Sequence, residues 1–158
     1  MGAMSKRDLS RVLGEEDRAR RLAERIVELC EKGEDEGQLA REVEGFLAYL
    51  TDDLEIHLAH EETDLFPALA ARDLEAETRE ALRQHGELRT LRRALLAVPQ
   101  HDTKALHDAA LALALALIHH TAYEADFLYV DITKDEARTF RAGVDADRHA
   151  PGTPRSED

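Results

Sequence analysis

The sequence is poor in the residues that stabilise disulfide-rich or β-sheet proteins. Cys30 is the only cysteine among 158 residues, so no intrachain disulfide can form and no oxidising compartment is needed. Aromatic residues make up only 4% of the chain, Gly and Pro are sparse, and no run of β-branched residues has the pattern of a strand. Ala, Leu, Glu and Arg fill the stretches between, which predicts one domain built from long helices.

Positive charge is also scarce. The chain carries 21 Lys and Arg residues against 34 Asp and Glu residues, a formal net charge of -13. This charge repels phosphate backbones and anionic membranes, so neither nucleic acid nor a membrane is an expected partner. The excess carboxylates either keep a small helical protein soluble or bind cations, and composition alone does not choose between the two.

The sequence has no segment with the pattern of a signal peptide or a membrane span. Residues 1–3 precede a second methionine, Met4, and we expect residues 1–6 to be a tag remnant and flexible N-terminus. The most apolar run, residues 109–118, is well short of the ~20 residues that cross a bilayer. We therefore expect a cytoplasmic protein whose most apolar helix is covered by its neighbours.

Apolar residues recur with helical spacing in four segments, at about residues 7–32, 37–71, 74–98 and 102–132. Gly33 and Pro99 follow the first and third segments as stop signals, and Asp102 can cap the fourth. The expected core positions include Ala19, Ile26, Phe46, Leu54, Leu65, Leu82, Leu88, Leu113, Leu117, Phe127 and Leu128.

The short connections between these segments predict an all-α fold, an up-down-up-down antiparallel four-helix bundle over residues 7–132. An open helical array is the alternative, and the short connections count against it. Thr133 and Glu136 have the spacing of a capping box, which predicts a short helix over residues 133–142. We expect the polar residues 143–158 to form a disordered tail.

Polar residues occupy core positions on three of these segments. His57 and Glu61 are four residues apart, so they lie on one helix face and can converge on one point. His120 and Glu124 repeat this spacing, and His85 adds a third imidazole. Burying such groups unpaired costs several kcal/mol, so something must offset that cost. Three imidazoles and two carboxylates at a common level of a bundle predict a metal site.

This donor set favours iron or manganese, and carboxylates from different helices can hold two ions close together. Zinc is less suited, because a closed tetrahedral site needs four ligands and would leave some of these groups unused. A buried network of His–Glu ion pairs without metal is the competing interpretation.

Polar neighbours of these five residues are expected to lie outside the site. His60 and His119 are turned away from the shared helix faces by about 60° and 100°. Glu62 is expected to face solvent, with orientation of a ligand imidazole as the alternative. Tyr123 and Tyr129 are expected to pack at helix interfaces, with a hydrogen bond near the metal as the alternative.

The motif HxxxEExxLFPxL at residues 57–69, followed by a single His85 and a second HxxxE motif, resembles the hemerythrin-like, or HHE cation-binding, domain family. The resemblance covers about residues 7–132. It implies a four-helix bundle that holds a non-haem diiron centre, with Glu61 and Glu124 as bridging carboxylates. The ligands that it implies are His57, Glu61, His85, His120 and Glu124.

One position departs from the family pattern. The family usually has a ligand histidine on the first helix, in a pattern such as HxxIxxLLxxL, but this chain has no histidine before His57. Aligning that pattern with the first apolar stripe puts Glu16 in the place of the histidine, so we expect Glu16 to be a sixth ligand. The alternative is that Glu15, Glu16 and Asp17 are acids that interact favourably with the helix dipole.

A shell of three histidines and three glutamates is more anionic than a histidine-rich one and favours ferric iron. We therefore expect two iron ions joined by an oxo or hydroxo bridge, with manganese as the alternative metal. Such a centre would bind, sense or react with oxygen, peroxide or nitric oxide. The alternatives are a diiron oxidative enzyme, an oxygenase or peroxidase acting on an unknown small molecule, and a metal-free structural bundle.

Overall fold

The computed structural model describes residues 6–33, 35–99 and 101–148, with side chains described from Asp17 onward. No strand occurs in this part of the chain, which confirms the all-α class. The main helices are α1 (Lys6–Lys32), α2 (Glu36–Tyr49), α3 (Glu55–His60), α4 (Phe66–Leu69), α5 (Glu75–Leu96), α6 (Thr103–Phe127) and α7 (Lys134–Arg148). The π-helical turns η1 (Leu50–Leu54), η2 (Glu61–Leu65) and η3 (Ala70–Leu74) and the 3-10 turn η4 (Tyr129–Asp131) join them.

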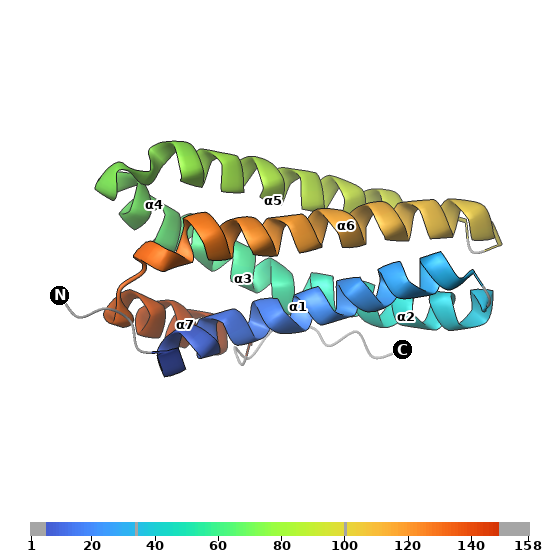
Figure 1. Ribbon diagram of the computed structural model, residues 1–158, viewed down its shortest axis with the longest axis horizontal. Helices are drawn as coiled ribbons and strands as arrows, with labels where there is room; N and C mark the ends of the chain where they lie inside the picture. The colour runs from blue at the N-terminus through green and yellow to red at the C-terminus, as the bar shows by residue number, and fades with distance from the viewer. Residues whose placement is uncertain (1–5, 34, 100, 149–158) are drawn as a thin grey trace.

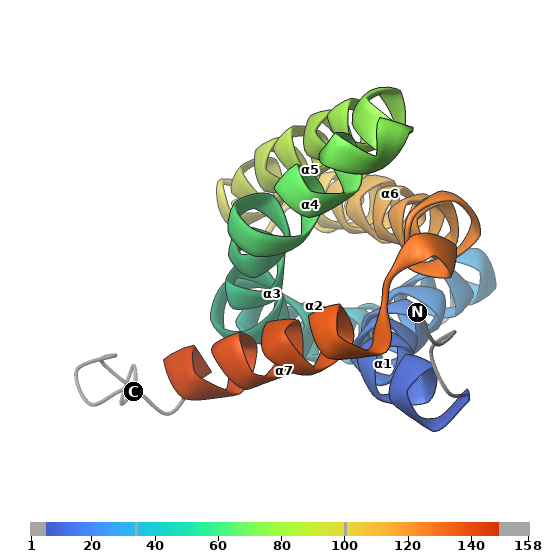
Figure 2. The same cartoon turned by 90° about the vertical axis from the view of Figure 1, so that its left-hand side faces the viewer.

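The described chain forms a bundle of four long helical segments. Figure 1 shows α1, the α2–α4 segment, α5 and α6 side by side along the long axis, and the end view in Figure 2 shows them around a common axis. α1 packs against α6 and α2, and α5 packs against α6. The up-down-up-down order of these segments stays a prediction.

The helix ends follow the signals in the sequence. Gly33 adopts a φ of +64°, the left-handed conformation that ends a helix at low cost for glycine, and its N–H donates to Leu29 O at 3.2 Å. Asp102 caps α6 by accepting a hydrogen bond from the Ala105 N–H at 3.0 Å. Asp35 caps α2 in the same way through the Gln38 N–H at 2.9 Å.

The second segment is nearly continuous from Glu36 to Leu74 but is interrupted by π-helical turns. Glu61 begins the turn η2, and Pro67, just after it, lacks the N–H that a regular helix needs. Non-helical backbone at Arg72 and Asp73, which has a φ of 67°, then turns the chain into α5. Glu61 and Leu65 are four residues apart, and both face the interior.

The buried apolar side chains of the described residues form two clusters on either side of a polar layer. Along α6, Leu117 belongs to the first cluster and Leu128, just after the helix, to the second, with His120 and Glu124 between them. Leu54 and Leu65 flank the layer in the same way on the second segment, and Leu88 and Ala81 do so on α5.

Two expected core residues are exposed. Leu82 is 45% exposed, because the buried row of α5 runs through Ala81, His85 and Leu88 and leaves Leu82 on the outer side. Phe127 is 53% exposed at the last turn of α6, where its ring packs on Tyr123 with centroids 4.9 Å apart. Both core predictions were therefore wrong.

The capping box at the start of α7 is confirmed, but the helix is longer than predicted. The Glu136 N–H donates to Thr133 Oγ1 at 3.2 Å, and the Thr133 N–H donates to Glu136 Oε1 at 3.0 Å. α7 continues to Arg148 because Val144 is fully buried in the second cluster, so residues 143–148 are helical and not part of a tail. Residues 149–158 and 1–5 lie outside the described residues.

α7 crosses one end of the bundle between α1 and α3, as Figure 2 shows. The segment Thr103–Asp131, which contains α6, is long and apolar enough to cross a membrane by length and composition. It packs against α1 and α5 and carries two buried polar residues of the central layer, His120 and Glu124. α6 is therefore a packed helix of the bundle.

We expect Thr133→Ala to lower the free energy of unfolding by about 1 kcal/mol, because it removes the side-chain acceptor of the capping box. Thr139→Ala is the matched control, since Thr139 is exposed on the same helix. The control should be neutral or slightly stabilising, because Ala has the higher helix propensity. Urea unfolding measures both changes, and equal effects of the two substitutions would show that the cap does not stabilise α7.

The negative charge on Glu136 should stabilise the fold at neutral pH, and this stabilisation should disappear in acid. Its hydrogen bonds to Arg72 and Thr133 hold the pKa of the Glu136 carboxyl below its ordinary value of 4.5. A carboxyl with a lowered pKa in the folded state stabilises the protein above the unfolded pKa, and this contribution is lost as the pH falls through the folded pKa. Glu136→Gln keeps the capping geometry and removes only the charge.

We therefore expect Glu136→Gln to be about 0.5 kcal/mol less stable than wild type at pH 7 and equally stable once the pH is below the lowered pKa of the folded state. Urea unfolding across a pH series measures the difference, with Glu44→Gln, an exposed position on α2, as control. A difference that stays constant with pH would rule out this role for the charge.

Candidate metal centre

The polar layer between the two clusters is built by three segments of the bundle. α3 and η2 supply His57 and Glu61, α5 supplies His85, and α6 supplies His120 and Glu124. His85, Glu61 and Glu124 are fully buried, and His57 and His120 are 2% exposed. The spacing of four residues places each histidine against its glutamate, with 2.6 Å between His57 Nε2 and Glu61 Oε1 and a close contact between His120 Nε2 and Glu124 Oε1.

Four of these residues converge on one point. Glu61, His85, His120 and Glu124 each offer a ligand atom, and these atoms lie within 4.8 Å of one another. His85 Nε2 lies 3.1 Å from Glu61 Oε2 and 3.4 Å from Glu124 Oε1. The structure therefore brings together four of the six predicted ligands from three segments. We call these four residues the convergent group.

The chemistry of this group fits a bound metal ion. In the described part of the chain, no contact with hydrogen-bond geometry reaches Glu61 Oε2 or His120 Nε2, although both atoms are buried. A buried polar atom without a hydrogen bond costs about 1–3 kcal/mol. Both atoms are metal ligands by type and belong to the same convergent group, so one ion would satisfy them together.

His85 is held in place from behind by a residue that the sequence placed in solvent. Its Nδ1–H donates to Glu62 Oε1 at 2.7 Å, and Arg89 Nη1 donates to the same oxygen at 2.7 Å. Burial raises the pKa of Glu62, but its hydrogen bonds to Arg89 and His85 outweigh burial and lower it. The expectation that Glu62 faces solvent was therefore wrong. The contact with His85 agrees with the alternative, in which Glu62 orients a ligand imidazole.

His120 is oriented in the same way by Gln84, which the sequence analysis missed. The His120 Nδ1–H donates to Gln84 Oε1 at 2.9 Å, and Gln84 Nε2 donates to Glu80 Oε1 at 3.0 Å. Both contacts leave the Nε2 atom of a histidine directed at the convergent group. The available signal was that Gln84 lies in the buried row of α5 next to His85.

Protonation of His85 compensates the two buried carboxylates in the metal-free protein. Burial alone would lower the pKa of His85, but the nearby carboxylates of Glu124 and Glu61 outweigh it and raise the pKa to about 10. The imidazole therefore carries a positive charge at neutral pH when no metal is bound.

His57 lies on the other side of the Glu61 carboxylate. Its Nε2 contacts Oε1, whereas the convergent group includes His85 next to Oε2. The Tyr129 hydroxyl donates to Glu61 Oε1 and lies 3.3 Å from His57 Nε2. The rings of His57 and Phe140 pack edge to face, with their centroids 5.0 Å apart. Packing alone was therefore the wrong expectation for Tyr129, which also makes a hydrogen bond in the site.

The remaining predictions have different outcomes. The side chain of Glu16 lies outside the described residues, so its role as a ligand stays a prediction. Its backbone lies in α1, three residues before the fully buried Ala19. His60 contacts Asp64 at 3.0 Å and is not one of the four convergent residues, and His119 is exposed, as expected.

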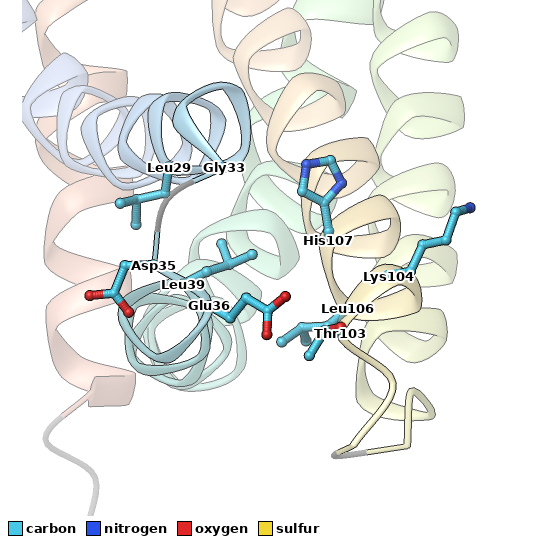
Figure 3. A pocket seen from close by; sticks show the side chains of 9 residues that line it. All are labelled: Leu29, Gly33, Asp35, Glu36, Leu39, Thr103, Lys104, Leu106 and His107. Carbon is cyan, nitrogen blue, oxygen red and sulfur yellow. The ribbon is translucent and has the colours of Figure 1, made fainter.

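A pocket of about 230 Å³ lies away from this centre (Figure 3). The end of α1 and the starts of α2 and α6 enclose it, and Leu29, Glu36, Leu39, Lys104 and His107 contribute to its lining. About 25 Å of α6 separates its Thr103 from His120. The pocket is therefore no entrance to the His–Glu group.

The family model of the hemerythrin HHE cation binding domain matches residues 8–129, which include the whole His–Glu group. Neither a curated protein nor a solved structure matches the chain significantly. The matched region contains every described ligand candidate and most of the bundle. The chain therefore belongs to the hemerythrin HHE cation-binding domain family.

Proposed function

We propose that this protein is a non-haem diiron protein that binds, senses or reacts with oxygen, peroxide or nitric oxide. The observation that supports this proposal most strongly is the convergent group. Its atoms Glu61 Oε2 and His120 Nε2 are of a type that binds metal ions, are buried, and make no hydrogen bond in the described part of the chain. In a metal-free network of His–Glu pairs, these atoms have ion-pair contacts but no contact with hydrogen-bond geometry in the described part of the chain. Metal binding satisfies them and fits the family.

Two donor sets around one carboxylate support a centre with two ions. Glu61 presents Oε2 to His85 and Oε1 to His57, so a metal ion on each side would share Glu61 as a bridge. Glu124, the glutamate of the second motif, is the proposed second bridge. The nitrogen and carboxylate donors favour iron, with manganese as the alternative. We take the bundle that holds them to be up-down-up-down.

Burial of the centre supports a small ligand. His57, Glu61, His85, His120 and Glu124 are at most 2% exposed, so oxygen, peroxide or nitric oxide can approach more easily than an organic substrate. The carboxylate-rich donor set, with Glu16 as a further member, favours ferric iron and hence sensing or reaction over reversible oxygen carriage. The single cysteine supports a reducing, cytoplasmic location.

The residues of the chain position the centre and exclude water from it. Bound iron would supply the coordination site and the redox chemistry. Glu62 and Gln84 fix the orientations of His85 and His120, and the Phe140 ring of α7 covers His57. The second apolar cluster covers the layer from one end of the bundle.

We expect His120→Ala to weaken metal binding by more than about tenfold, since it removes a ligand of the convergent group. His119→Ala is the matched control, because His119 is the exposed neighbour on the same helix and should bind metal as wild type does. Metal content after dialysis and competition with a chelator measure the affinity. Equal metal binding by both variants would contradict the proposed site.

A second variant covers the case in which His120→Ala fails to fold. Gln84→Leu keeps a buried side chain of similar size and removes the acceptor that orients His120, together with the hydrogen bond from Gln84 to Glu80. It should weaken metal binding by about 10- to 100-fold while the circular dichroism spectrum stays helical.

The role of Glu16 is tested by comparing Glu16→Ala with Glu15→Ala. Loss of a ligand to one ion should lower the metal content of Glu16→Ala towards one ion per chain, whereas Glu15→Ala should keep two. Glu16→His should restore two, because imidazole is the ligand that the family usually has at this position. If Glu16→Ala keeps two ions with unchanged affinity, the acids of this segment act only on the helix dipole.

A further inference from the structure

We propose that the hydroxyl oxygen of Tyr129 is a ligand of the metal ion on the His57 side of Glu61, an assignment that rests on the proposed diiron centre. Tyr129 is the first residue of η4 and follows Leu128 after α6, the helix that carries His120 and Glu124. It is 1% exposed. This residue is no part of the HxxxE motifs that predict the other ligands.

Three donor atoms from separate elements meet on this side of Glu61. His57 Nε2 lies 2.6 Å from Glu61 Oε1 and 3.3 Å from Tyr129 Oη, and the Tyr129 hydroxyl donates to the same Oε1. All three residues are buried. The group is separate from the convergent group on the Oε2 side, because neither His57 nor Tyr129 belongs to that group.

The distances from His57 Nε2 to the two oxygen atoms suit ligands of one ion. Nitrogen and oxygen ligands lie about 2.1 Å from a first-row metal ion, so two of them at right angles are about 3 Å apart. The distances of 2.6 and 3.3 Å from His57 Nε2 to its two neighbours bracket this value. The ion would need only small movements of side chains that are already adjacent.

Fewer described candidate metal ligands lie on the His57 side of Glu61 than on the His85 side. On the Oε2 side, His85, His120 and Glu124 surround Glu61, whereas on the Oε1 side the described members of the predicted ligand set contribute only His57. Tyr129 adds an oxygen where an ion would otherwise have few protein ligands. Its ring belongs to the second buried cluster, together with Leu128, Ile132 and Phe140, which restricts the position of the hydroxyl.

Coordination changes the chemistry of both partners. An iron–oxygen bond forms, the O–H bond of the phenol breaks, and the proton leaves to solvent. A phenolate is a hard anionic ligand, so it favours the ferric ion. Ferric iron bound to phenolate absorbs visible light by charge transfer from the ring, a signal that histidine and carboxylate ligands do not give.

The test compares wild type, Tyr129→Phe and Tyr123→Phe, each loaded anaerobically with ferrous iron and then exposed to air. Tyr129→Phe removes one oxygen and keeps the packed ring. Tyr123→Phe is the matched control, because Tyr123 is next to Glu124 in the sequence but donates to Glu77 O at 3.2 Å, away from the group. The readouts are iron per chain, the visible absorption spectrum and the resonance Raman spectrum of the tyrosine ring.

We expect wild type and Tyr123→Phe to show the visible band and enhanced tyrosine ring vibrations, and Tyr129→Phe to lose both completely while still binding iron. Iron-loaded wild type without the band, or a band that survives in Tyr129→Phe, would overturn the assignment. The diiron proposal would survive that result, with Tyr129 acting only as a hydrogen-bond donor to Glu61. Wild type that binds no iron would overturn both.

Discussion

The burial of two carboxylates between apolar clusters is the constraint on which the rest of this structure depends. Glu61 and Glu124 are fully buried, and an uncompensated charge at such a position costs several kcal/mol. The histidine four residues before each glutamate and the protonated His85 between them offset part of that cost. Glu61 Oε2 and His120 Nε2, which make no hydrogen bond within the described part of the chain, are atoms that a metal ion would use.

Support for the centre extends outward from the buried imidazoles to the surface. Glu62 joins His85 to Arg89, which in turn pairs with Glu55 at 2.8 Å. Gln84 joins His120 to Glu80, which pairs with Arg83. These chains of contacts fix imidazole orientations in a bundle whose backbone already places the residues at one level, so the site is organised before any ion binds.

The spacing of residues along each helix predicted much of the fold and the site. The four segments, the caps at Asp102 and Thr133 and the buried positions of the His–Glu pairs all follow from contacts within one helix. Glu62, Gln84 and Tyr129 could not be assigned, because their roles depend on which faces of different segments meet. Packing between elements also decided where α7 ends, through the burial of Val144.

Glu61 is the residue at which the two donor sets meet, so a direct view of the metal positions around it is the most decisive measurement. Crystals of the iron-loaded protein, measured by anomalous diffraction at the iron absorption edge, should show two peaks per chain. One peak should lie at bonding distance from Oε2, near His85 and His120, and the other near Oε1 and His57. A single peak, or no peak with the His–Glu contacts unchanged, would contradict a two-ion centre bridged by Glu61.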